Sequence, residues 1–598
     1  MEIKRIFDLL DQYAANFPKC DALAGKEEGE WIKYSTKQYI EISTYISYAF
    51  LHLGVQKGDT IATITHNRPE WNFLDMGIQM VGAIHVPIYP NISEADYKYI
   101  FNHAEIKYVF GAGEDLYRKL SNILPEVPSL KGIYTFKNLH GFKHLNELIK
   151  LGIDHPAKEK LAAIKASIST DDVATLIYTS GTTGIPKGVM LTHANIISNF
   201  IAVSYIPPIG PEDRALSFLP LCHVYERMLN YLYQYMGVSI YYAESLGTIV
   251  DNMKEIKPAL ITCVPRLIEK IYDRILKTGR KQPQLKKKIF FWAINLGLNY
   301  ELDKANGRWY EFKLKIANMI VFNKWRDIFG GHLKLIVSGG AALQPRLSRI
   351  FCAARIYIHE GYGLTETSPV IAVSSFVDKD GVKFGTVGKP LRGVLVKIAE
   401  DGEILCKGPG VMKGYYKDEE LTKTVIDDQG WFHTGDLGVF EPKGQLHITG
   451  RKKEIFKTSF GKYVNPGQIE DKFKESPIID TLMVVGENQK YAAALIVPDF
   501  NDLKSWCENK GIVYTSNPEM INHPDVKRKF KKEIAYYNTF FGETEQIRSW
   551  EIMDSEWSVF SGELTPTLKL KRNYINKKYQ DNITRLFEVN GNLAGNNK

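Results

Sequence analysis

Residues 178–188 read Tyr-Thr-Ser-Gly-Thr-Thr-Gly-Ile-Pro-Lys-Gly, a loop built from hydroxyls, glycines and one lysine. Glycines let backbone N–H groups approach an oxyanion closely, and the hydroxyls can donate further hydrogen bonds. The lysine supplies a point of positive charge. We therefore predict a phosphate-binding loop. The residues expected to contact the anion are Thr179, Ser180, Gly181, Thr182, Thr183, Gly184 and Lys187.

The segments on either side of the loop support this interpretation. Ala174–Tyr178 predicts a buried strand entering the loop, and residues 191–197 predict a helix leaving it. The loop is not a P-loop, because Lys187 follows a proline and precedes a glycine instead of standing in Gly-Lys-Ser/Thr. This excludes the usual kinases and GTPases. The alternative is a flexible Gly/Thr linker, which the single central charge and the flanking elements disfavour.

The composition is that of an ordinary globular protein, with 44% hydrophobic and 24% charged residues in 598. The net charge of +8 is mild for this length, and permits anionic substrates or membrane surfaces without indicating nucleic acid. The six cysteines are scattered without a CxxC pair, so we expect neither a zinc site nor disulfides, and a cytoplasmic location. No signal sequence and no stretch long enough to span a bilayer is expected.

The order of predicted elements indicates an α/β protein. Strands alternate with helices over residues 36–110 and 172–370, which predicts two mostly parallel sheets with covered faces. Glycine and proline become frequent over 384–450, where we expect a small β-rich subdomain. We predict an N-terminal domain at 1–450, a hinge at 451–453 and a small α+β C-terminal domain at 454–598.

Two polar clusters follow predicted strands. Ser338–Ala342 comes after the strand at 333–337, and His359–Glu366 comes after 356–358. Ligands of open α/β sheets bind beyond the carboxyl ends of the strands, so the two clusters and the phosphate loop can share one crevice. Tyr362 offers a flat face for a purine, and Glu366 is a hard oxygen ligand suited to Mg²⁺.

A third candidate is Asp436, which follows Thr434-Gly435. A carboxylate there can accept hydrogen bonds from both hydroxyls of a ribose. The alternative is an ordinary turn or capping aspartate.

Together these segments resemble the adenylate-forming acyl-CoA synthetases over essentially the whole chain and in the family's order. The segments are 178–188, 361–366, 434–436, Gly450-Arg451 and the tail 564–569. Residues 219–227 and 563–572 are similar to the long-chain fatty-acid members. The resemblance implies that ATP converts a fatty acid into an acyl-adenylate with release of pyrophosphate. CoA then displaces AMP, so ATP, Mg²⁺ and CoA are the expected cofactors.

The resemblance also implies roles for individual residues. It places the loop, with Thr182, on the phosphates, Glu366 on Mg²⁺, and Asp436 and Arg451 on the ribose. The adenine would lie against two short segments, whose expected nucleotide-binding residues are Gly339, Gly340, Ala341, Glu360, Gly361, Tyr362, Gly363 and Thr365.

The C-terminal part would supply the catalytic lysine, Lys569, with Lys571 as the competing candidate and a solvated tail lysine as the plain alternative. The commoner family form has Ser-Gly before this lysine, whereas this chain has Thr567-Leu568, as long-chain members do. The family uses two orientations of its small domain, with Lys453 at the pivot position. The residues expected to face the CoA thiol are Lys457, Gly461 and Lys462.

The acyl site is expected near His223, just before a predicted helix, because the family places an aromatic residue or a histidine there. A histidine packed in the core is the equally weighted alternative. The helix carries an apolar stripe that is mostly core and partly a tunnel wall. Its members are Tyr225, Met228, Leu229, Leu232, Tyr233 and Met236.

Two basic runs remain. Lys277–Lys288 precedes the apolar run Ile289–Ile294, which suggests peripheral contact with an anionic membrane. Residues 527–532 are expected to form a solvated helix face or to lie near the CoA phosphates.

The leading hypothesis is a long-chain fatty-acid–CoA ligase. The alternatives are an adenylate-forming ligase for another acid or for a carrier-protein acceptor, and a non-catalytic fatty-acid binding or uptake protein. The non-catalytic alternative is disfavoured because the candidate site residues are intact: Lys187, Glu366, Asp436, Arg451 and Lys569.

Overall fold

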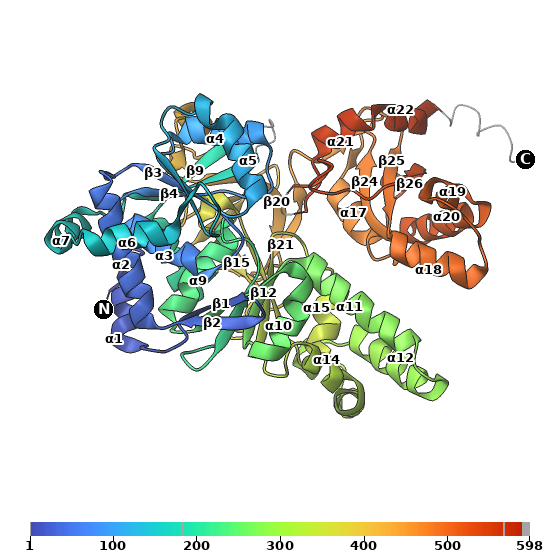
Figure 1. The fold of residues 1–598 in the computed structure, drawn as a ribbon. Coiled ribbons are helices and arrows are strands. Elements are labelled where there is room, and N and C mark those ends of the chain that lie inside the picture. Colours follow the sequence, from blue (N-terminus) through green and yellow to red (C-terminus); the bar gives the residue numbers. More distant parts are fainter. Residues whose placement is uncertain (1, 181–184, 566–567, 589–598) are drawn as a thin grey trace, which may run out of the picture. The chain divides into compact units, whose positions relative to one another are not determined.

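A computed structural model describes residues 2–180, 185–565 and 568–588 (Figure 1). It contains two compact units. The first runs to Lys397 and adds Leu405–Thr434 and Phe440–His447, and the second comprises Ile398–Ile404, Gly435–Val439 and the chain from Ile448 onwards. The hinge at 451–453 and the domain boundaries stay predictions.

The first unit contains an eight-stranded sheet in the order β19-β9-β8-β4-β3-β5-β6-β7. All five residues of β3 are buried, as expected for a strand covered on both faces. The strands from β8 to β7 pair in parallel, whereas β9 pairs antiparallel with both β8 and β19. The bounds are β3 (Thr60–Ile64), β4 (Ile84–Pro87), β5 (Tyr108–Gly111), β6 (Gly132–Thr135), β7 (Lys143–His144), β8 (Val173–Ser180), β9 (Pro186–Thr192) and β19 (Gly414–Tyr415).

A nine-stranded sheet completes the α/β part of this unit, in the order β16-β15-β14-β13-β12-β10-β11-β1-β2. The central run from β14 to β1 is parallel, and antiparallel strands close both edges. The bounds are β1 (Leu23–Glu27), β2 (Glu30–Tyr34), β10 (Arg214–Ser217), β11 (Ser239–Tyr242), β12 (Leu260–Cys263), β13 (Leu335–Gly339), β14 (Ile358–Gly363), β15 (Val370–Val373) and β16 (Lys389–Pro390). The predicted fold class is confirmed.

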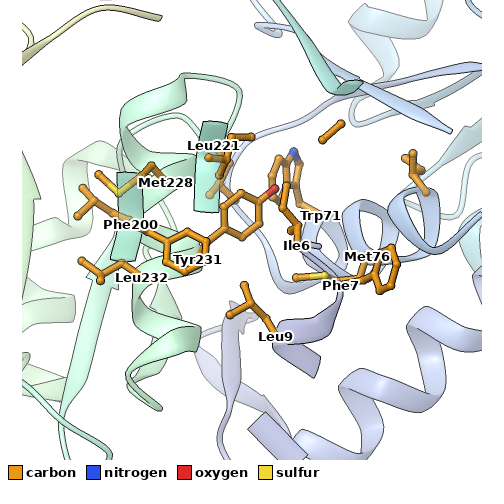
Figure 2. Close-up of a cluster of buried hydrophobic side chains, with 14 of the residues drawn as sticks. Ile6, Phe7, Leu9, Trp71, Met76, Phe200, Leu221, Met228, Tyr231 and Leu232 are labelled. Atoms are coloured by element: carbon orange, nitrogen blue, oxygen red, sulfur yellow. The ribbon is translucent and has the colours of Figure 1, made fainter. Parts of the chain in front are cut away.

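Helix α9 (Val224–Tyr235) lies in the core, and eleven of its 12 residues are buried. Figure 2 shows Met228, Tyr231 and Leu232 of this helix among apolar side chains from α1 (Asp8–Asn16) and α3 (Pro69–Met80). A helix buried on all sides must satisfy its polar groups inside the protein.

Arg227 of α9 does so through a buried network. Its guanidinium lies 2.6 Å from Asp75 of α3 and 2.6 Å from the Thr175 hydroxyl of β8. Asp75 also contacts Nδ1 of His85 at 2.6 Å. Burial alone would raise the pKa of Asp75, but Arg227 and His85 together lower it to about 2. The network fixes α9 against the sheet that carries the phosphate loop.

A four-stranded sheet follows, in the order β17-β18-β20-β21. The first seven residues of β20 alternate between buried and half-buried, which is typical of a strand with one covered face. The bounds are β17 (Leu395–Ile398), β18 (Glu403–Lys407), β20 (Phe432–Phe440) and β21 (Leu446–Arg451). The β-rich segment is confirmed.

The chain after this sheet folds around β24 (Ile479–Val485), β25 (Ala492–Pro498) and β26 (Ile547–Ile552). Every residue of β25 is buried, and alternate side chains enter two separate hydrophobic clusters. Each face of this small sheet is therefore covered. The helices are α17 (Pro466–Phe473), α18 (Phe500–Lys510), α19 (Asn517–Asn522), α20 (Pro524–Asn538), α21 (Arg572–Lys578) and α22 (Gln580–Glu588).

Candidate active site

The phosphate loop joins two antiparallel strands. Thr179 of β8 pairs with Lys187 of β9, so the loop is the tip of a β-hairpin. The prediction of a helix over 191–197 is wrong at its start, because residues 191 and 192 still belong to β9 and α8 begins at His193 (His193–Val203). The physical reason is that the apolar run after Gly188 pairs with β8 and buries its side chains. Gly181, Thr182, Thr183 and Gly184 lie outside the described residues.

Lys187 and Glu366 are linked by a tyrosine. The Lys187 ammonium lies 5.5 Å from the ring centre of Tyr415, whose hydroxyl donates to Oε1 of Glu366 at 2.9 Å. Tyr415 is held next to the loop because β19 pairs with β9, opposite Val189. Burial, and then the Glu366 charge, raise the pKa of Tyr415, so its hydroxyl remains a donor at neutral pH.

Tyr415 is a candidate residue that the sequence reasoning missed. Its segment contains no charge pattern or metal-ligand spacing that would single it out. Only the pairing of β19 with β9 brings it to the loop.

Glu366 lies in the short helix η5 (Thr365–Thr367), directly after β14. The side chain is half-buried, and its backbone carbonyl accepts from the N–H of Met412 at 2.8 Å. Gly363 permits the Pro369 backbone to approach the end of β14, since a Cβ there would lie 1.8 Å from the carbonyl oxygen of Pro369. The carboxylate is therefore held by close backbone packing.

The two glycine clusters predicted to line adenine lie side by side. In the parallel pair β13–β14, Gly339 is opposite Gly361 and Ser338 is opposite Glu360. The strand β14 runs through Gly363, whereas the sequence suggested that it ends at residue 358. Gly340 and Ala341 are exposed beyond β13, Tyr362 is half-buried, and Thr365 is buried.

The carboxyl group of Glu360 is committed to the protein. It is buried and accepts from the Ser348 hydroxyl at 2.8 Å. Burial raises its pKa to about 7. Only the backbone of Glu360 is therefore positioned to contact a ligand at the strand end.

An apolar cavity of about 30 Å³ lies behind these strands. Met228, Leu229 and Leu232 of α9 form one wall, and Gly361 contributes to the other. Tyr225 also lines it, whereas Tyr233 and Met236 of the predicted stripe do not. The volume equals about one methylene or one water, so an acyl chain can enter only if the side chains move.

His223 is the N-cap of α9, as its predicted position before a helix requires. Its Nδ1 accepts from the Tyr225 N–H at 3.2 Å, and the ring is half-buried. The ring thus stands at the end of the helix that forms the cavity wall.

The second unit brings together three residues predicted from distant segments. Arg451 Nε lies 3.1 Å from Oδ1 of the buried Asp436. Lys569 is close enough to both to interact electrostatically. The pKa of Lys569 is lowered to about 8, mainly because its ammonium group is withdrawn from water and secondly because of the Arg451 charge. Much of the rest of the residue is exposed. Asp436 and Glu454 oppose this decrease.

The segment that carries Lys569 is anchored by a neighbouring glutamate. Glu563 is buried and accepts from the Lys578 ammonium at 2.6 Å and the Tyr579 hydroxyl at 3.0 Å. Burial by itself would raise the pKa of Glu563, but these partners lower it to about 2. Thr565 N–H donates to the Lys569 carbonyl at 2.8 Å, so the chain turns back at the lysine. Thr567 lies outside the described residues.

The predicted pivot and CoA-facing residues are on the surface of the second unit. Lys453 is exposed, whereas its neighbour Lys452 is paired with Asp401 and Glu403. The predicted CoA loop joins β22 (Phe456–Lys457) to β23 (Tyr463–Val464), and Lys457, Gly461 and Lys462 are all exposed.

Comparison with known proteins identifies the class. The AMP-binding enzyme family matches residues 10–416, and the AMP-binding enzyme C-terminal domain matches residues 454–590. The long-chain-fatty-acid–CoA ligase FadD15 of Mycobacterium bovis is 33% identical over 94% of this chain and 93% of that protein. The peroxisomal long chain acyl-CoA synthetase 6 of Arabidopsis thaliana is 32% identical over 92% of this chain and 80% of that protein.

Solved structures agree on the fold. The adenylation domain of a carboxylate reductase from Mycobacterium chelonae has a TM-score of 0.76 at 20% identity, covering 98% of this chain and 91% of that one. An anthranilate CoA ligase has a TM-score of 0.71 at 18% identity, covering 96% and 97%.

The fold and these matches place the chain in the AMP-binding enzyme family. Within that family it is an adenylate-forming acyl-CoA synthetase. ATP and CoA are its substrates beside the acid.

Proposed function

We propose that the protein is a long-chain fatty-acid–CoA ligase. One observation carries the choice of acid. The apolar cavity along α9 reaches Gly361, in the strand that leads through Gly363 to Glu366. An apolar wall beside a phosphate-binding region suits a molecule with a hydrocarbon chain and a carboxylate head, because each buried methylene stabilises the complex by about 0.8 kcal/mol.

In the first step a carboxylate oxygen of the fatty acid attacks the α-phosphorus of ATP. The bond between the α-phosphorus and the oxygen bridging to the β-phosphorus breaks, and pyrophosphate leaves. Two anions must meet, so positive charge directed at the phosphates lowers the barrier. We assign this to Lys187 and the loop from Thr179, and to Lys569 at the carboxylate and α-phosphate.

In the second step the CoA sulfur attacks the acyl carbonyl carbon, the bond from that carbon to the phosphate oxygen of AMP breaks, and AMP leaves while the thiol proton passes to water. Lys457, Gly461 and Lys462 would face the thiol, and Lys453 would serve as the pivot between the two steps. Asp436 and Arg451 would hold the ribose throughout. Their 3.1 Å pairing holds the carboxylate in place as an acceptor.

The residues around Glu366 fit a magnesium ion. One carboxylate oxygen accepts from Tyr415, which leaves further lone pairs for a hard cation. The described residues contain no group of three or more His, Cys, Asp or Glu that could hold a metal alone. This suits Mg²⁺, which binds through one or two carboxylates plus substrate phosphates. When bound, the ion would neutralise charge on the leaving pyrophosphate.

The function is tested by ATP-dependent pyrophosphate release with a panel of acids, with and without CoA. We expect release with long-chain fatty acids and acyl-CoA formation when CoA is present. A preference for acetate or aryl acids would contradict the long-chain assignment. Acyl transfer only to a carrier protein, or fatty-acid binding without release, would support the alternatives.

Replacing Tyr415 with phenylalanine is expected to slow adenylation roughly 10- to 100-fold, since it removes a hydrogen bond to a charged carboxylate. The loss should shrink as Mg²⁺ is raised, because the role of Tyr415 is to orient Glu366. Tyr416→Phe is the matched control, with its ring against His103 instead. If the adenylation rates of Tyr415→Phe, Tyr416→Phe and the parent protein depended on Mg²⁺ in the same way, Tyr415 would not have the role of orienting Glu366.

Replacing Gly361 with valine is expected to penalise long acids selectively. A Cβ at Gly361 meets only the Ser338 carbonyl oxygen, at 4.0 Å, so the backbone tolerates it while the cavity loses space. We expect kcat/KM to fall about fourfold for each methylene excluded, with octanoate little affected. Gly361→Ala should give a smaller effect of the same kind. An equal loss at every chain length would place the effect on the nucleotide.

A further inference from the structure

The positive charge of the chain is concentrated in one segment. Residues 277–324 contain 11 Lys and Arg against 3 Asp and Glu, a balance of +8. The whole chain also has a net charge of +8, so the other 550 residues carry 65 charges of each sign. A concentration of this kind indicates an anionic partner at this part of the surface.

The segment forms a group of helices in the first unit. They are the end of α11 (Pro265–Arg280), α12 (Gln284–Leu298), α13 (Arg308–Ala317) and the π-helical turn η4 (Asn318–Phe322). Figure 1 shows α11 and α12 as neighbouring helices, and α12 also packs against α13 and η4.

Large apolar side chains are exposed on α13 and η4. Trp309 is 67% exposed, Phe312 54%, Met319 65% and Ile320 45%. The rings of Trp309 and Phe312 stack at 5.5 Å, and Lys313 lies over Trp309. Trp309 and Phe312 are one turn apart on α13, and Met319 and Ile320 follow in the π-helical turn η4. We call these four exposed side chains the apolar stripe; several large apolar side chains exposed in one short segment mark an interaction site.

The apolar run predicted to touch a membrane contributes less than the sequence suggested. Ala293 and Ile294 of α12 are buried, and the Phe290 ring lies close to Gly279 of α11. From this run only Ile289 and Trp292 are exposed.

A cavity of about 670 Å³ lies beside the apolar stripe. Lys304, Arg308, Lys315 and Arg355 line it, and its one carboxylate is Glu311. Within the described ranges none of these four cations forms an ion pair or a side-chain hydrogen bond. Arg308 and Lys315 belong to the same helix as Trp309 and Phe312. Unpaired cations around one hollow repel each other, and an anion placed there offsets that repulsion.

We propose that this segment docks on an anionic phospholipid bilayer, with the lipid phosphate held in the basic cavity and the apolar stripe in the interface. The cavity supplies guanidinium and ammonium donors for a phosphate, and the stripe supplies the Trp, Phe and Ile typical of interfacial helices. Met319 and Ile320 lack a π face on which a base could stack, which favours lipid over single-stranded nucleic acid. The inference goes beyond the proposed reaction and does not depend on it.

The test is co-sedimentation of the full-length protein with phosphatidylcholine vesicles that contain about one third phosphatidylglycerol, beside pure phosphatidylcholine vesicles. We expect binding to the anionic vesicles only, weakened by salt. Arg308→Gln/Lys315→Gln should weaken it roughly 25-fold, about fivefold per cation. Trp309→Ser/Phe312→Ser should also weaken it. The matched control is Lys158→Gln/Lys160→Gln, which removes two exposed lysines of α7 (Lys158–Ser167) and should bind like the parent.

Equal binding to both vesicle types, or unchanged binding of the cavity variant, would overturn the proposal. The proposal would also be overturned if Arg308→Gln/Lys315→Gln lost binding of inorganic phosphate or of an oligonucleotide but still bound vesicles. That result would show that the cavity holds a different anion. Pyrophosphate release with octanoate, measured without vesicles, should be unchanged in all variants. A failure of catalysis is thereby distinguished from a failure of docking.

Discussion

Replacing Lys569 with alanine is expected to lower the rate of acyl-adenylate formation by at least about 10³-fold, or roughly 4 kcal/mol of transition-state stabilisation. The ammonium lies by Arg451 and Asp436, the residues proposed for the ribose, and is the group assigned to the carboxylate and α-phosphate. Thioester formation from supplied acyl-adenylate and CoA should be largely retained. The measurement is pyrophosphate release for the first step and acyl-CoA formation for the second.

Lys571→Ala is the matched control. Lys571 caps α21, and its backbone N–H donates to the Glu563 carbonyl at 2.8 Å, a bond that alanine keeps. We expect both steps to remain near the parent rate.

Because the pKa of Lys569 is lowered to about 8, kcat/KM for adenylation should fall as pH rises above that value in the parent protein. An equal loss of both steps in Lys569→Ala would refute a role confined to adenylation.

Replacing Glu366 with glutamine is expected to slow adenylation by about 10²- to 10³-fold. The amide oxygen still accepts from Tyr415, so the local structure is kept while the negative charge for Mg²⁺ is lost. The variant should need more Mg²⁺ and bind MgATP more weakly, which titration calorimetry measures without turnover.

Glu360→Gln provides the comparison on the same strand. Its carboxyl group accepts from Ser348 and is buried with a pKa raised to about 7, so an amide replaces it with little loss. We expect a change of less than about tenfold, since only the Glu360 backbone is placed to contact a ligand. A loss as large as that of Glu366→Gln would show that the Glu360 side chain takes part.

The sequence predicted the classes of elements because their periodicity is local. The all-buried strand Thr60–Ile64, the helix after His223 and the β-rich stretch at 384–450 are each visible in runs of a few residues. Prediction failed where pairing partners are distant. Residues 191 and 192 continue β9 because β8 lies beside them, and Gly361-Tyr-Gly363 is strand because β15 pairs with all three residues.

The same distinction applies to the site. Lys187, Glu366 and Asp436 could be singled out because charged residues in polar, glycine-bearing segments are chemically conspicuous, whereas Lys569 was indicated only by the resemblance to the acyl-CoA synthetases. Tyr415 could not, because its link to Glu366 exists only through the pairing of β19 with β9. The buried carboxyl of Glu360 likewise became a structural group once Ser348 was seen beside it.

The sequence alone thus determined the fold class through local patterns, predicted the phosphate loop from its residue types, and indicated the chemistry of an adenylate-forming enzyme through the resemblance of its motifs to that family. Only the tertiary structure decided that the loop is a hairpin tip, that a tyrosine joins Lys187 to Glu366, and that apolar side chains of α9 lie against Gly361. It also placed four unpaired cations around one cavity beside exposed aromatic rings. The physical reason is that strand pairing and burial bring together residues hundreds of positions apart, and no local pattern records those contacts.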